Sequence, residues 1–107
     1  MPDTVTITAP KSVARSEVAT DRGWKAVLFN DEVTPLDVVI FGLQRAAGLS
    51  EELAEAVALE AHQHEQAVVK RGLSEEDAKI LCGGLRKWTR IDGICPGVKC
   101  EAQQDDE

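Results

Sequence analysis

The chain has 107 residues, 43% hydrophobic and 29% charged, which suits a single globular domain. Its net charge of −7 argues against nucleic acid as a partner, because a phosphate backbone attracts basic surfaces. No apolar stretch approaches the roughly 18 residues that a membrane span needs, and the first residues lack the basic-then-apolar order of a signal peptide. We therefore expect a cytoplasmic protein with no membrane partner.

The chain begins with a segment, residues 1–23, that is rich in Thr, Ser, Ala and Val and has no clear periodicity. This composition predicts a flexible N-terminal tail. The apolar run 24–30 then predicts a strand that is covered on both faces. The polar, acidic end 103–107 predicts a second tail, so the folded domain is expected over residues 24–102.

A first helix is predicted after Thr34, the expected N-cap, with Pro35 at the first helical position and Gly48 as the stop. Its apolar stripe, at helical spacing, consists of Leu36, Val39, Ile40, Leu43 and Ala47. Ser50 is expected to cap a second helix. The apolar face of that helix holds Leu53, Ala54, Val57, Ala58 and Ala61. His62 falls on the same stripe, whereas His64 is expected to face solvent.

A short strand over 67–71 is predicted to end at Gly72, and Ser74 to cap a third helix. The buried stripe of this helix is expected to be Ala78, Leu81, Cys82, Leu85 and Trp88. Turn signals follow, and residues 98–102 predict a last strand. The order β-α-α-β-α-β indicates an α+β sandwich, with three helices on one face of a small antiparallel sheet.

One corner of the predicted domain gathers hydrogen-bond acceptors. The first strand ends at Asn30, Asp31 and Glu32, and His62 is expected to project toward them from the second helix. Acceptors beside an apolar wall suit a primary ammonium that carries a hydrophobic group. The alternative is structural: polar residues at a strand end often satisfy the backbone of a turn, and a histidine on an apolar helix face is often a packed core residue.

The segment from Trp24 through Asn30-Asp31-Glu32-Val33-Thr34-Pro35-Leu36 resembles the signature of the ClpS adaptor family. Weaker matches follow at Leu43-Gln44, His62, Ala67-Val68-Val69 and the capped helix that carries Ala78. The resemblance runs from about Trp24 to Cys100.

Members of this family deliver substrates to AAA+ Clp unfoldases and recognise N-degrons, proteins whose first residue is a large hydrophobe. The resemblance therefore implies two partners: a ClpA- or ClpC-like unfoldase, and substrate proteins with hydrophobic N-termini. It also implies that the tail 1–23 engages the unfoldase during hand-over. Neither catalysis nor a cofactor is implied.

The resemblance assigns roles to eight residues. The α-amino group of the substrate would be held by Asn30, Asp31 and His62. Glu32 and Thr34 would shape the rim, and the hydrophobic pocket would be lined by Leu36, Val39 and Ala58.

The chain departs from the family pattern at several positions. Glu32 stands where Asp is usual, Glu65 where Gly is usual, and Gly97 where Leu is common. Ala58 stands where a larger residue, often Met, is usual, which predicts either a roomier pocket that favours aromatic termini or an ill-formed one.

The three cysteines, Cys82, Cys95 and Cys100, are an odd number, which argues against a disulfide framework. A zinc site on Cys95 and Cys100 would need further ligands such as His62 or His64, so buried, reduced thiols are the simpler interpretation.

Two alternatives to the adaptor stay open. One is a non-degron interaction domain that docks on a protein partner. It would be either a divergent paralogue of the adaptor family or a domain like the C-terminal domain of the ribosomal stalk, a similar sandwich without an amino-group pocket. The other is an enzyme, but the chain has no Gly-rich phosphate loop and no nucleophile elbow. A Cys–His pair such as Cys82 with His62 is a catalytic candidate, but Cys82 lies on a predicted core stripe.

Overall fold

The computed structural model describes residues 22–105 of the chain. Their elements follow in the order β1 (Trp24–Phe29), α2 (Leu36–Ala47), α3 (Glu51–His64), β2 (Gln66–Leu73), α4 (Glu75–Trp88), β3 (Arg90–Ile91), β4 (Cys95–Pro96) and β5 (Lys99–Gln104). The greater part of the predicted N-terminal tail, residues 1–21, and the last two residues lie outside the described range.

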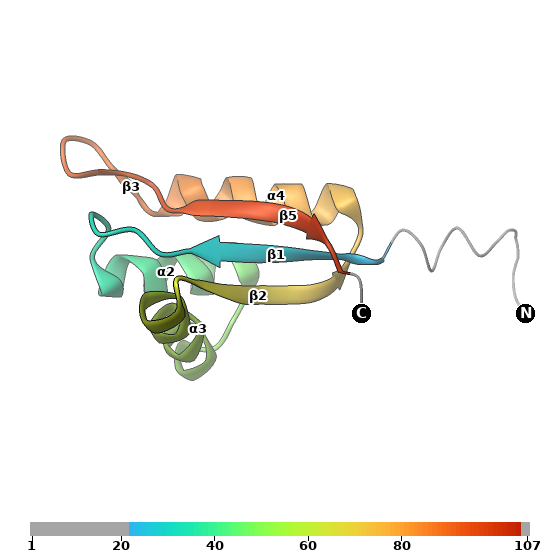
Figure 1. The fold of residues 1–107 in the computed structure, drawn as a ribbon. Helices are drawn as coiled ribbons and strands as arrows, with labels where there is room; N and C mark the ends of the chain where they lie inside the picture. Colours follow the sequence, from blue (N-terminus) through green and yellow to red (C-terminus); the bar gives the residue numbers. More distant parts are fainter. Residues whose placement is uncertain (1–21, 106–107) are drawn as a thin grey trace, which may run out of the picture.

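Strands β2, β1 and β5 form a three-stranded antiparallel sheet with β1 in the centre (Figure 1). The apolar run of β1 suits this place, because Ala26, Val27 and Leu28 are all buried. The last strand extends two residues beyond its predicted end at Ala102, since Gln104 still pairs with Trp24. The predicted α+β class, with three helices and a small antiparallel sheet, is confirmed.

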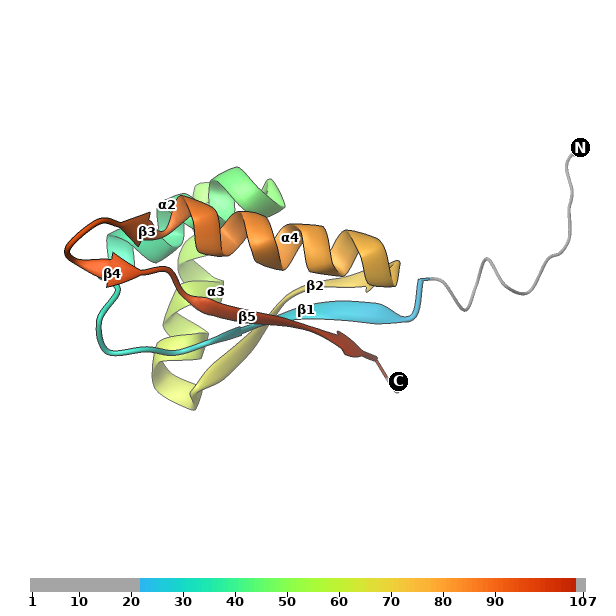
Figure 2. The ribbon, with the colours of Figure 1, turned by 90° about the horizontal axis from the view of Figure 1, so that it is seen from above.

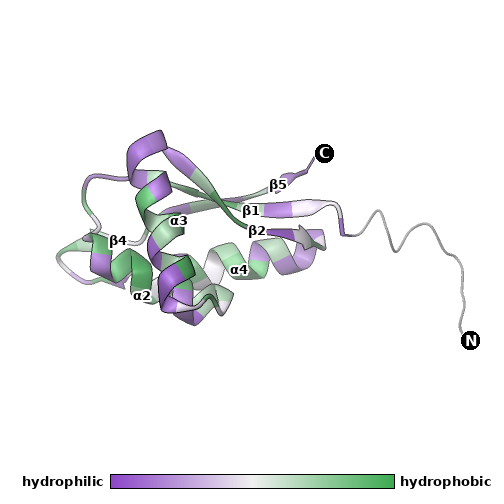
Figure 3. Cartoon of the chain, turned by 90° about the horizontal axis from the view of Figure 1, so that it is seen from below, coloured by the Kyte–Doolittle hydropathy of each residue, from purple (hydrophilic) through white to green (hydrophobic). Residues whose placement is uncertain are grey.

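All three helices bury their apolar sides in one core, which they share with alternate residues of the sheet. Figure 2 shows α2 and α4 together on one side of β1 and β5, and α3 contacts both α2 and β2. Each helix carries both hydrophobic and hydrophilic residues along its length (Figure 3), as amphipathic helices do. The core is mainly aliphatic, as the scarcity of aromatic residues predicts.

The helix caps follow the sequence at three positions and depart from it at one. Ser50 and Ser74 accept hydrogen bonds from the N–H groups of Leu53 and Asp77, and Gly48 ends α2 in the left-handed conformation. The prediction that Thr34 caps α2 is wrong. The cap residue is Pro35 and no side chain bonds there, because the Thr34 hydroxyl donates to Asp31 instead.

A small hairpin of β3 and β4, beyond α4, was not predicted as strands, although the turn signal at Asp92-Gly93 lies within it. The stripe prediction for α4 is also wrong at Trp88, which is 44% exposed and packs edge-on against Phe41. The fully buried residue is its neighbour Thr89.

Glu65 ends α3 with a φ of 76°, the only positive φ at a non-glycine residue in the described range. Its carbonyl oxygen accepts the Asn30 N–H at 2.9 Å, which ties the end of α3 to the end of β1. A side chain makes this left-handed conformation unfavourable, and glycine is the residue that usually occupies it.

Glu65→Gly is therefore expected to raise the free energy of unfolding by about 0.5–1 kcal/mol, the gain being reduced by the greater freedom of glycine in the unfolded chain. Urea denaturation of the parent, Glu65→Gly and Glu65→Ala chains measures this. Glu65→Ala is the control, since it removes the same side chain without relieving the backbone. A Gly variant no more stable than the Ala variant would contradict the expectation.

Candidate functional site

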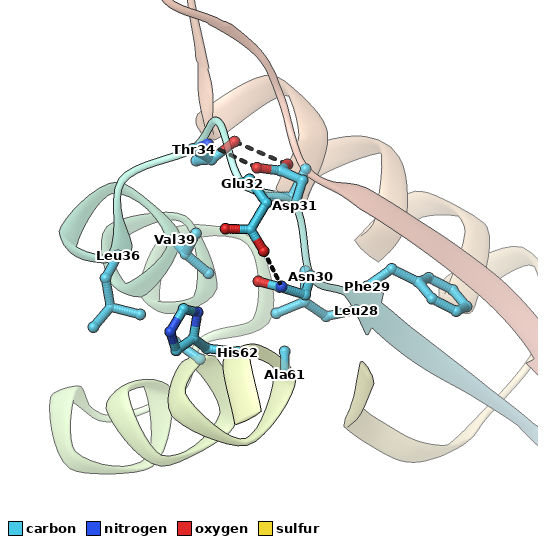
Figure 4. A pocket seen from close by; sticks show the side chains of 12 residues that line it. Leu28, Phe29, Asn30, Asp31, Glu32, Thr34, Leu36, Val39, Ala61 and His62 are labelled. Carbon is cyan, nitrogen blue, oxygen red and sulfur yellow. Dashed lines mark hydrogen bonds between the residues drawn. The ribbon is translucent and has the colours of Figure 1, made fainter. Parts of the chain in front are cut away.

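A hollow of about 140 Å³ opens at the end of β1, bordered by the turn that follows it and by α2 and α3 (Figure 4). All eight site residues predicted from the sequence line it: Asn30, Asp31, Glu32, Thr34, Leu36, Val39, Ala58 and His62. Four further residues complete the lining: Leu28, Phe29, Ala61 and Val98. Phe29 and Ala61 adjoin predicted site residues in the sequence, and Leu28 lies two residues before Asn30, whereas no sequence signal points to Val98.

Two side chains of the turn set the polar rim. The Asn30 amide nitrogen, Nδ2, donates to Glu32 Oε2 at 3.2 Å. This bond directs the amide nitrogen toward the carboxylate and leaves the amide oxygen facing the hollow, as Figure 4 shows. The Asn30 backbone N–H also donates to the Glu65 carbonyl oxygen. Both the backbone and the side chain of Asn30 are therefore fixed by hydrogen bonds. The rim therefore presents an amide oxygen and a carboxylate side by side.

Asp31 organises the turn itself. Its Oδ1 accepts the N–H groups of Val33 at 2.9 Å and Thr34 at 2.7 Å, and its Oδ2 accepts the Thr34 hydroxyl at 3.0 Å. An ionised carboxylate has about four acceptor positions, so three of them serve the turn. The structural alternative considered from the sequence thus applies to Asp31, while its neighbours on the rim stay available.

Asp31→Ala is expected to lower the free energy of unfolding by about 2 kcal/mol, because three hydrogen bonds to a charged acceptor are lost together. Asp31→Asn is the matched control: it keeps an acceptor oxygen for the two N–H groups and should lose about half as much. Thermal and urea unfolding measure both. Equal stability of the parent and Asp31→Ala chains would show that the turn does not depend on these bonds.

His62 lies in the last turn of α3, on an exposed part of the helix, and its ring faces Asn30 across the hollow (Figure 4). Within residues 22–105, no hydrogen bond or ion pair involves its side chain. The alternative of a packed core histidine therefore does not apply. His64, two residues further along, does not line the hollow.

Aliphatic side chains form the floor. Leu28, Val39 and Ala58 are buried, whereas Leu36 is 41% exposed and lies at the mouth. Leu36 therefore borders the opening rather than the core, although periodicity alone places it on the core stripe.

Val98, which also lines the hollow, is held in place by a hydrogen bond to Thr89. The buried Thr89 hydroxyl accepts the Val98 N–H at 2.9 Å and donates to the Leu85 carbonyl at 2.8 Å. This relay fixes the chain between β4 and β5 against the end of α4, which places the Val98 side chain at the hollow.

The catalytic candidate from the sequence is not assembled. Cys82 contacts Cys100 and lines a different hollow from His62, so the two residues form no nucleophile–base pair. The zinc ligands considered from the sequence are also apart: the Cys95 thiol donates to the Thr89 carbonyl, and Cys100 faces Cys82. Across residues 22–105, no three potential metal ligands gather.

Over the described range 22–105, none of the helices is both long and apolar enough to cross a bilayer.

The chain resembles known proteins both in its sequence pattern and in its fold. The model of the family described as "ATP-dependent Clp protease adaptor protein ClpS" matches residues 19–101. No curated protein sequence matches the chain. Among solved structures, the chain is similar to Agrobacterium tumefaciens ClpS2 bound to L-phenylalaninamide, with 22% identity over 77% of this chain and 95% of that one, and a TM-score of 0.60. At this identity the likeness concerns the fold.

Proposed function

Because the chain belongs to the ClpS family of ATP-dependent Clp protease adaptors, we propose that it binds proteins through a hydrophobic N-terminal residue and delivers them to a Clp AAA+ unfoldase. The observation that carries the proposal is the convergence of Asn30, Glu32 and His62 on one apolar hollow.

The polar rim matches the chemistry of a chain terminus. An α-ammonium has three N–H donors, which need acceptors when water is displaced. The Asn30 amide oxygen, the Glu32 carboxylate and a neutral His62 ring nitrogen supply them from two separated parts of the chain. Hydrogen bonds to a charged group contribute about 1.5–3 kcal/mol each. Asp31 can add one acceptor position at most, and acts chiefly by holding the turn.

The apolar floor matches a hydrophobic first side chain. A dry cavity of about 150 Å³ in another protein holds a benzene molecule, and this hollow has a similar size of about 140 Å³. The ring of phenylalanine therefore fits, and burying such a side chain contributes about 1.5–3 kcal/mol. The ligand named for Agrobacterium ClpS2, L-phenylalaninamide, has the same chemistry: an ammonium beside an aromatic group.

A peptide series that differs only in its first residue tests the proposal. Fluorescence anisotropy should show Phe- and Leu-initiated peptides binding roughly 10–150-fold more tightly than the Gly-initiated peptide, in line with the burial of one apolar side chain. L-phenylalaninamide should displace them. If all first residues bind alike, or none binds, the interaction domain without a degron pocket becomes the better description.

Delivery would use the second predicted partner, a ClpA- or ClpC-like unfoldase. We propose that the folded domain, expected over 24–102, carries the peptide site and that the tail 1–23 engages the unfoldase in the cytoplasm. Deleting residues 2–21 should leave peptide affinity unchanged and abolish degradation of a Phe-initiated substrate by the adaptor, unfoldase and protease together. Undiminished degradation would refute the assignment of unfoldase engagement to the tail.

A further inference from the structure

A second feature, remote from the peptide hollow, is a pair of thiols between α4 and β5. The sulfurs of Cys82 and Cys100 lie 2.7 Å apart, and both residues are buried. The odd number of cysteines argued against a disulfide framework, but the fold pairs two of the three. Cys95 is separate, with its thiol on the Thr89 carbonyl.

The pair borders a surface hollow of about 330 Å³ that Lys79, Gly83, Arg86 and Glu101 also line. Gly83 is exposed, and a side chain placed there would meet no atom within 4 Å. The hollow beside Cys82 is therefore open to a small solute at this point, although the sulfurs themselves are largely covered.

We propose that Cys82 and Cys100 are a redox-active pair that closes to an intramolecular disulfide on reaction with hydrogen peroxide. In the first step the Cys82 thiolate attacks one peroxide oxygen, the O–O bond breaks, and Cys82 becomes a sulfenic acid with release of water after proton uptake. In the second step the Cys100 sulfur attacks the Cys82 sulfur, the S–O bond breaks, and a second water leaves. Peroxide is reduced by two electrons, and the two thiols supply the electrons and two protons.

The surroundings assign the attacking role to Cys82. The hydrogen bond from Cys100 lowers the pKa of the Cys82 thiol, and the Arg86 charge adds to this, against burial and the Glu101 charge. The same hydrogen bond, together with burial, raises the pKa of the Cys100 thiol. The lowered pKa favours Cys82 as the attacking sulfur, and Cys100 is the resolving thiol held beside it.

Little movement is needed to form the bond. A disulfide has an S–S distance of about 2.05 Å, so the sulfurs must approach by about 0.7 Å. The two elements already pack against each other along their length. The closed loop would span residues 82 to 100 and would join α4 directly to β5.

The full chain, treated with hydrogen peroxide and then denatured, tests the proposal. Free thiols should fall from three to one, the intact mass should fall by two hydrogen atoms, and a proteolytic map should link Cys82 to Cys100. Because the bond closes a loop in the unfolded chain, the melting temperature should rise by about 5–15 °C and return on reduction.

Matched serine variants separate the three positions. Cys95→Ser should behave as the parent chain, and Cys82→Ser should keep both remaining thiols. Cys100→Ser should stop at a sulfenic acid on Cys82 that dimedone labels. Three thiols surviving in the parent chain, or a link that includes Cys95, would overturn the proposal, and neither result depends on a variant folding.

Discussion

A His62→Ala chain is expected to bind a Phe-initiated peptide roughly 10–150-fold more weakly than the parent, the loss of one hydrogen bond to a charged group. Its unfolding free energy should stay within about 0.5 kcal/mol of the parent value, because His62 is exposed and no described residue bonds to its side chain. Titration of a labelled peptide and urea unfolding of the same preparations measure the two quantities.

The matched control is His64→Ala, which removes the same side chain from the same turn of α3 but outside the hollow. It should leave peptide affinity unchanged. Equal affinities of the His62→Ala and parent chains for the peptide would show that the imidazole takes no part in binding. A matching loss in the His64→Ala chain would trace the effect to the helix end instead of the hollow.

Gly97→Ala is expected to produce the largest loss of stability, about 3 kcal/mol or more, from a methyl group with no room and a strained backbone. Gly97 has a φ of 101°, and an added Cβ would lie 2.5 Å from the Arg86 carbonyl oxygen. Urea unfolding measures the loss.

Gly93→Ala separates strain from collision. Gly93 also has a positive φ, 80°, but an added Cβ would meet no atom within 4 Å. This variant should therefore lose only about 1–2 kcal/mol. Similar losses in the two variants would show that the contact with Arg86 relaxes at little cost. Because Val98 follows Gly97 and lines the hollow, Gly97→Ala should also weaken peptide binding in the fraction that folds.

Most of the fold could be predicted from local signals in the sequence. The β1 run, the serine caps and Gly48 act over a few residues, so they could be predicted without knowledge of packing. The wrong predictions occur where tertiary contacts override these local preferences. Thr34 bonds Asp31 rather than capping α2, and Trp88 leaves the core to Thr89 because the chain turns into the small hairpin there.

The candidate site was predictable because its polar residues lie in one motif, and His62 stands at a helix position that points back to it. The role of Asp31 was less accessible, since only coordinates show that the turn occupies its carboxylate. Val98 could not be foreseen: a hydroxyl nine residues earlier in the chain positions it. The Cys82–Cys100 contact likewise depends on how α4 lies against β5.

The most direct test of the central claim compares two peptides that begin with Phe and differ only by an N-terminal acetyl group. Acetylation removes the positive charge and two of the three donors while keeping the aromatic side chain. In calorimetric titrations, we expect saturable binding of the free peptide and at least about a hundredfold weaker binding of the acetylated one, as the loss of two charged hydrogen bonds implies. Equal affinity for the two peptides would contradict recognition of a chain terminus by Asn30, Glu32 and His62.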